Sequence, residues 1–167
     1  MTTTRPLIGA AVGAALLAVS ACGSDDPELL TKTDFIAQAD AICGTATTES
    51  EPLWEAFWAG FEEESDVDGG DAMFVRFDGL LDDLDPITDQ QLEDLRALEP
   101  PAEDTEFVEG LHDDFEDGLA EMNDIVDRAV DGDEQAREAM TTDEGDPLAD
   151  VNEAARDYGL VVCGAED

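Results

Sequence analysis

Basic residues are scarce in this chain: its 167 residues include seven Lys and Arg against 45 Asp and Glu, a formal net charge of -38 at pH 7. Such a surface repels nucleic-acid phosphates and anionic lipid headgroups, and it attracts cations or basic partners. We therefore exclude nucleic acid as a partner. Like charges also weaken a folded domain by a repulsion that salt screens. A saline habitat, specific cation binding and a bias of the lineage remain open as the origin of the acidity.

Sequence motifs of catalytic chemistry are also missing. There is no phosphate-binding glycine loop with a lysine, no metalloprotease histidine pair and no serine in a nucleophile elbow. The single histidine, His112, has no partner motif, and we expect it at the surface or the boundary of the core. Zinc is not expected either, because Cys43, Cys163 and one distant histidine do not give ligand spacing. We predict a protein that is not an enzyme and has no cofactor.

The beginning of the chain lacks acidic residues, since every Asp and Glu follows Gly23. An uncharged run over 6–21 has the length of a signal-peptide core and is too short for a comfortable membrane span. Val19-Ser20-Ala21-Cys22 resembles the lipobox of bacterial lipoproteins, in which cleavage precedes a cysteine that receives diacylglycerol. An ordinary secretory signal and a weak membrane span are the alternatives.

The lipobox resemblance divides the chain into three parts. These are a signal peptide over 1–21, a lipidated tether over 22–33 and an acidic domain over 34–167. Two acyl chains on Cys22 would hold the protein firmly, since one chain alone gives only marginal binding. We expect a lipoprotein at the extracytoplasmic face of the cell membrane.

Two cysteines remain once Cys22 is assigned to the anchor. In an exported domain, oxidising conditions favour a bond between Cys43 and Cys163. The bond would span 120 positions (163 − 43). From chain entropy, a disulfide that closes a loop near this size stabilises the folded state by about 4 to 5 kcal/mol. Two buried free thiols, or a nucleophile at one of them, are the alternatives.

Apolar residues recur at intervals of three to four over the acidic domain, and 43% of the chain is hydrophobic, so we expect it to fold. No segment alternates long enough to predict a strand. Helices are expected over about 34–61 with a kink or a new start at Pro52, 74–84 with a break at Pro86, 87–98, 102–130, 134–140 and 147–159. The fold class predicted is all-α, an antiparallel bundle of about four main helices.

Three segments resemble a group of small secreted or lipid-anchored actinobacterial proteins of unassigned function. They are DFIAQADAIC at 34–43, LRALEPPAED at 95–104 and YGLVVCG at 158–164. The resemblance spans most of the acidic domain in order, except for 64–71. It implies a helical domain with paired cysteines, and it supplies no activity.

An acidic loop offers a candidate calcium site at Asp66, Asp68 and Asp71, around two glycines. The pattern is weak, because an EF-hand loop beginning at Asp66 would need an acidic residue at position 77, which is Phe. Clusters of this kind also arise by chance among 45 acidic residues.

Four aromatic residues, Trp54, Phe57, Trp58 and Phe61, recur closely enough to line a ligand pocket or to meet a protein partner. The same spacing is typical of a buried helix face. The leading hypothesis is a non-enzymatic envelope lipoprotein that acts as a binding or interaction module. An extracytoplasmic protein that binds a small ligand or calcium is the alternative. A hydrolase with a carboxylate pair comes third.

Overall fold

The computed structural model describes residues 30–63, 71–142 and 146–165. The expected signal peptide, Cys22 and the candidate calcium ligands Asp66 and Asp68 lie outside these ranges. Within them the chain forms five helices and no strand, so the prediction of an all-α fold is confirmed. None of these helices combines the length and the hydrophobicity that a membrane span requires.

Helix α1, Lys32–Glu63, begins two residues before the start expected at about residue 34. The hydroxyl oxygen of Thr31 accepts a hydrogen bond from the backbone N–H of Asp34 at 3.2 Å and donates one to its carboxylate at 2.6 Å. Such a side chain satisfies a donor that the first helical turn leaves unpaired. Of the two alternatives at Pro52, a second helix is wrong, because α1 is continuous through this residue.

Helix α2, Asp71–Arg96, also contains a proline, and here the prediction that Pro86 breaks the helix is wrong. Leu80 and Leu84 before the proline and Leu92 and Leu95 after it are all buried, and their spacing places them on one face. Burying each leucine stabilises the helix by about 1.5 to 3 kcal/mol, which together exceeds the roughly 3 kcal/mol that an interior proline costs. Pro86 itself is exposed, so its ring faces solvent rather than a neighbouring helix.

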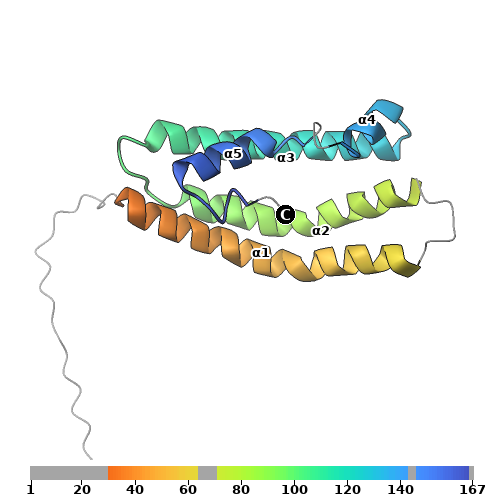
Figure 1. The fold of residues 1–167 in the computed structure, drawn as a ribbon, viewed down its shortest axis with the longest axis horizontal. Coiled ribbons are helices and arrows are strands. Elements are labelled where there is room, and N and C mark those ends of the chain that lie inside the picture. Colours follow the sequence, from red (N-terminus) through yellow and green to blue (C-terminus); the bar gives the residue numbers. More distant parts are fainter. Residues whose placement is uncertain (1–29, 64–70, 143–145, 166–167) are drawn as a thin grey trace, which may run out of the picture.

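The remaining helices are α3 over Thr105–Val130, α4 over Glu134–Ala139 and α5 over Ala149–Tyr158. Helices α1, α2 and α3 run alternately up and down, and α4 and α5 return along α3 (Figure 1). The fold is therefore an antiparallel bundle whose fourth element is split into two short helices. Helix α5 ends at Gly159, whose φ of 115° is a left-handed conformation that favours glycine.

The core consists of three clusters rather than one. At the end where α1 begins, buried residues from α1, α2, α3 and α5 meet, including Phe35, Leu95, Val108 and Tyr158. At the other end one cluster joins α1 to α2, and another joins α2 to α3 and α4. The four-element packing thus exists at one end only, because α5 is short.

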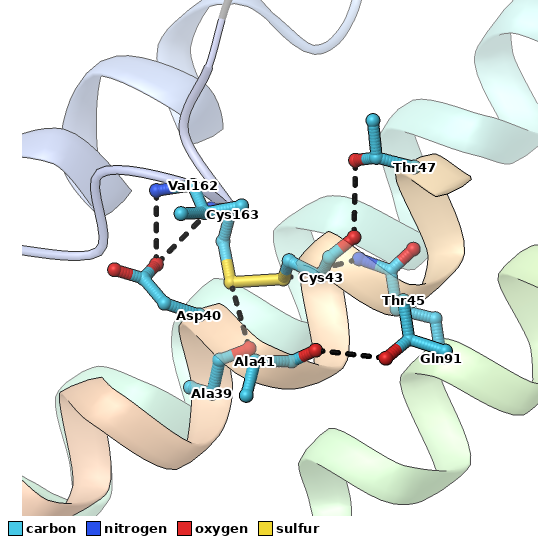
Figure 2. The surroundings of a disulfide bond; sticks show 9 residues. All are labelled: Ala39, Asp40, Ala41, Cys43, Thr45, Thr47, Gln91, Val162 and Cys163. Atoms are coloured by element: carbon cyan, nitrogen blue, oxygen red, sulfur yellow. Dashed lines mark hydrogen bonds between the residues drawn. A yellow bond between two sulfur atoms is a disulfide. The ribbon is translucent and has the colours of Figure 1, made fainter. Parts of the chain in front are cut away.

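Cys43 of α1 and Cys163 of the C-terminal turn lie at disulfide-bonding distance, with their Cα atoms 5.1 Å apart, as the sequence analysis expected (Figure 2). Asp40 holds the same turn, because one of its carboxylate oxygens accepts hydrogen bonds from the backbone N–H of Val162 at 2.9 Å and of Cys163 at 3.2 Å. From α2, the Gln91 amide donates to the sulfur of Cys43 at 3.3 Å. These contacts fix the end of the chain to the first half of α1.

Candidate ligand-binding groove

An open groove of about 420 Å³ lies between the two core clusters at the end of the bundle away from the disulfide. It is bounded by the second half of α1, the start of α2, the second half of α3 and the chain that follows α4. Its larger apolar lining residues are Trp54, Phe57, Trp58, Met73, Phe77, Met122, Ile125 and Met140. A small-molecule site typically has this size and a mainly apolar lining of this kind.

The groove stays open because the returning chain meets α3 only partway along its length. Pro147 and Leu148 pack against α3 at Gly118, where a Cβ atom would lie 2.6 Å from a methyl carbon of Leu148. Met122, which lines the groove, lies one helical turn beyond Gly118. Since α5 begins at Ala149, it covers the other half of α3, and in this half the short helix α4 packs against the end of α3 and the start of α2.

The aromatic residues of α1 divide into a buried anchor and an accessible surface. Phe57 is buried, and its ring centroid lies 4.9 Å from that of Trp58, 6.0 Å from that of Trp54 and 5.7 Å from that of Phe77. Trp54 is half-buried, and Trp58 is 59% exposed. The core interpretation therefore fits Phe57, and the binding interpretation fits Trp58.

The fourth aromatic residue of the sequence pattern, Phe61, belongs to α1, but its side chain lies outside the described part of the structure. No sequence pattern marks the groove residues of the other helices as ligand contacts. Met73, Phe77, Met122 and Met140 come from three separate regions of the chain and meet only in the tertiary structure. Their spacing within each helix is that of ordinary core residues.

Acidic side chains lie in and near the groove. Asp146 is part of its lining, and Glu51 and Glu55 line an adjoining hollow that shares Trp54 and Trp58 with the groove. All three carboxylates are exposed. No Lys or Arg of the described chain lines the groove. The local field is therefore negative, as is that of the whole molecule.

Asp71, the one candidate calcium ligand in the described chain, forms an ion pair with Arg137 at 2.9 Å. The guanidinium of Arg137 also lies over the ring of Phe74, 5.0 Å from its centroid. Within the described ranges, no three His, Cys, Asp or Glu side chains are grouped as metal ligands would be. Asp71 thus joins the start of α2 to α4.

His112 lies away from the groove, on α3, and is half-buried, at the boundary of the core. It borders a small cavity of about 50 Å³ that Gln91, Asn152 and both paired cysteines also line. Burial lowers the pKa of its imidazole, and the positive charge of Arg96 lowers it further. No described lining residue of the groove also lines this cavity.

The chain was compared with protein-family models, with curated proteins and with solved structures, and none of these comparisons finds a match. The resemblance to actinobacterial lipid-anchored proteins stays a prediction from the three sequence segments. The case for a function rests on the groove and on the sequence.

Proposed function

We propose that this protein is a non-enzymatic binding module, held by lipid on Cys22 at the extracytoplasmic face of the cell membrane, and that it binds a small apolar ligand in the groove. One observation carries the binding proposal. A space of about 420 Å³, lined by aromatic and methionine side chains, opens beside a Trp58 that is 59% exposed. Indole rings bury large apolar areas on binding, and methionines adapt to the shape of a ligand.

The chemistry of the lining supports binding rather than catalysis. Asp146 is the one titratable side chain among the described lining residues. General acid–base chemistry needs groups whose pKa values suit proton transfer and which lie within reach of the substrate. His112, whose pKa is lowered, lines two cavities at the other end of the bundle instead.

The position of the groove along α1 fits an anchored protein. Leu30 follows Cys22 by eight residues, which span at most about 28 Å. Trp54 lies 22 residues after Lys32, or about 33 Å along the helix. An anchor at Cys22 would hold the first turn of α1 near the membrane and leave the groove at the far end, where a soluble ligand can reach it.

The binding proposal is tested with a neutral probe, 4-phenylbutanol, on the chain from Gly23 to Asp167, which contains every described helix. Both tryptophans of the chain, Trp54 and Trp58, line the groove, so their fluorescence reports on this site. We expect saturable changes in emission and a rise in the unfolding midpoint with probe concentration.

A pair of variants locates the binding. Trp58→Ala should weaken binding at least threefold, since the indole supplies much of the accessible apolar surface. Val161→Ala removes an apolar side chain that is 66% exposed at the opposite end, and it should leave binding unchanged. Linear, non-saturable quenching, or equal effects of the two variants, would argue against a binding site in the groove.

The lipid anchor is tested separately by expressing the full precursor in a bacterial host. We expect the wild-type chain in the membrane fraction with a diacylglycerol-modified N-terminal cysteine in its mass spectrum, and Cys22→Ser in neither state. A wild-type chain that is exported without lipid would overturn this part of the proposal and leave the groove untouched.

A further inference from the structure

Resting on the proposed function of the groove, we infer that its ligand is a small organic cation with an apolar body. The volume of about 420 Å³ suits one such molecule. Trp54, Trp58 and the methionines would contact the body. The acidic residues at the border would attract the charge.

The aromatic surface of the groove suits a cation. The face of an indole ring carries negative potential and attracts ammonium groups more strongly than the face of Phe or Tyr. Elsewhere this chain already pairs cations with aromatic rings, since the Lys32 ammonium lies 3.7 Å from the centroid of Tyr158. Because Trp58 is 59% exposed, a ligand can reach its ring from solvent.

Acidic residues near the groove also favour a cationic ligand. Asp146 lines the groove, and the carboxylates of Glu51 and Glu55 belong to the adjoining hollow that shares Trp54 and Trp58 with it. These exposed carboxylates attract a cation through solvent, and at physiological salt this attraction is screened beyond about 8 Å. The formal net charge of -38 adds a long-range attraction for cations and a barrier against anions.

One basic side chain lies close to the groove, since the guanidinium of Arg76 packs against Gly60 of α1. The other arginines of the described chain are held by other partners. Arg96 binds Glu116 at 2.7 Å, Arg128 binds Asp133 at 2.9 Å, and Arg137 binds Asp71 at 2.9 Å. Arg156 donates to the carbonyl oxygen of Gly164 at 2.7 Å. Arg76 is not part of the groove lining, and no Lys or Arg of the described chain is, so an anionic ligand in the groove would meet Asp146 as its one charged lining residue.

Three probes with the same body separate charge from apolar contact: 4-phenylbutyltrimethylammonium, 4-phenylbutanol and 4-phenylbutyrate. Each is titrated into the chain from Gly23 to Asp167, and tryptophan fluorescence is read. At 20 mM salt we expect the ammonium compound to bind about tenfold more tightly than the alcohol, and the carboxylate to bind most weakly. At 0.5 M NaCl the advantage over the alcohol should fall to about threefold, because screening removes the longer-range part.

Two matched triple variants locate the charge effect. Glu51→Gln with Glu55→Gln and Asp146→Asn removes the carboxylate that lines the groove and the two that line the adjoining hollow. Glu106→Gln with Glu153→Gln and Asp157→Asn removes three exposed carboxylates at the far end of α3 and on α5. The first set should weaken binding of the ammonium compound about fivefold and leave the alcohol within twofold. The second set should change neither by more than about twofold.

The outcomes separate the two proposals. If no probe binds saturably, the proposed binding function fails and this inference fails with it. If the alcohol binds as tightly as the ammonium compound at low salt, the groove is an apolar site and only the preference for cations is overturned. A Lys- and Leu-rich amphipathic peptide that binds the groove where the ammonium compound does not would also overturn it, since the partner would then be a protein.

Discussion

The side chain of Tyr158 joins three elements at the end of the bundle where α1 begins. Its hydroxyl donates to the carboxylate of Asp104, just before α3, with an O–O distance of 2.7 Å. Its ring meets that of Phe35 edge-on at 6.2 Å and stacks on that of Phe107 at 5.2 Å. Burial, together with the hydrogen bond to Asp104, raises the pKa of Tyr158 above its ordinary value.

We expect Tyr158→Phe to lower the free energy of unfolding by about 2 kcal/mol, because a hydrogen bond to a charged acceptor is lost and Asp104 is half-buried. Urea denaturation of the chain from Gly23 measures the change. Asp104→Asn provides the control, since the Tyr158→Phe change should have a much smaller effect in that background. An unchanged midpoint in Tyr158→Phe would show that water replaces the bond without loss.

His112 gives the stability of the domain a dependence on pH near neutrality. Its pKa in the folded state lies below the ordinary 6.5, mainly because of burial. Below pH 6.5 the unfolded state therefore binds protons that the folded state does not, so stability falls as the pH falls toward the folded pKa. Above 6.5 the imidazole is neutral in both states and contributes no slope.

The prediction is that wild-type protein loses more stability than His112→Gln when the pH is lowered from 7.5 to 5.5. Urea midpoints at the two pH values give the comparison. All other ionisable groups are the same in both proteins, so their contribution cancels in the difference. Equal changes in the urea midpoints of the two proteins would show that the imidazole is as exposed to solvent in the folded state as in the unfolded chain.

Among the helices, α2 shows how far local sequence rules reach. Apolar spacing correctly predicted helix on both sides of Pro86, and the proline rule wrongly separated them. The rule describes a local cost, whereas the helix is held by buried leucines: Leu80 and Leu84 pack with α1, and Leu95 belongs to the cluster that joins α1, α3 and α5. The sequence does not show which apolar stripes will share a face, and so it does not show when burial outweighs a lost hydrogen bond.

Pro86 therefore remains a local weakness in α2. It has no N–H for the carbonyl of residue 82, and its ring is exposed. We expect Pro86→Ala to raise the free energy of unfolding by about 1 to 3 kcal/mol. This gain is reduced by a few tenths of a kcal/mol, because the unfolded chain has more conformational freedom without the proline. The free energy of unfolding of Pro86→Gly should be about 1 kcal/mol lower than that of Pro86→Ala, since glycine is a poor helix former. Destabilisation by alanine would mean that the bundle requires a bend at this position.

The groove is formed by several helices that are far apart in the sequence, and for this reason it could be predicted only in part. Trp54, Phe57 and Trp58 stand out in the sequence because they are dense on one helix. The other walls depend on where α3 and the chain after α4 lie relative to α1, which no local pattern encodes. Gly118, which sets the point where the returning chain meets α3, looks in the sequence like any helix-interior glycine.

Charge is the other property of the whole molecule. Most of the acidic side chains in the described ranges are exposed. The seven basic residues of the chain leave its net charge strongly negative. We expect the unfolding midpoint of the chain from Gly23 to rise by several degrees between 20 mM and 1 M KCl, as the screening length falls from roughly 20 Å to about 3 Å. For a domain of this size, about 1 kcal/mol corresponds to a shift of roughly 4 °C.

Calcium separates general screening from a specific site. Since Asp71 is already paired with Arg137, we expect CaCl2 to raise the midpoint no more than KCl of equal ionic strength does. MgCl2 serves as a control for divalent charge, and calorimetry at each salt gives the midpoint. A rise of several degrees with millimolar calcium alone would show that a specific site exists, and Asp66→Asn with Asp68→Asn would then test whether the acidic loop forms it. Equal effects of the three salts would mean that the acidic residues act together, as a field that repels anions and draws cations toward the groove.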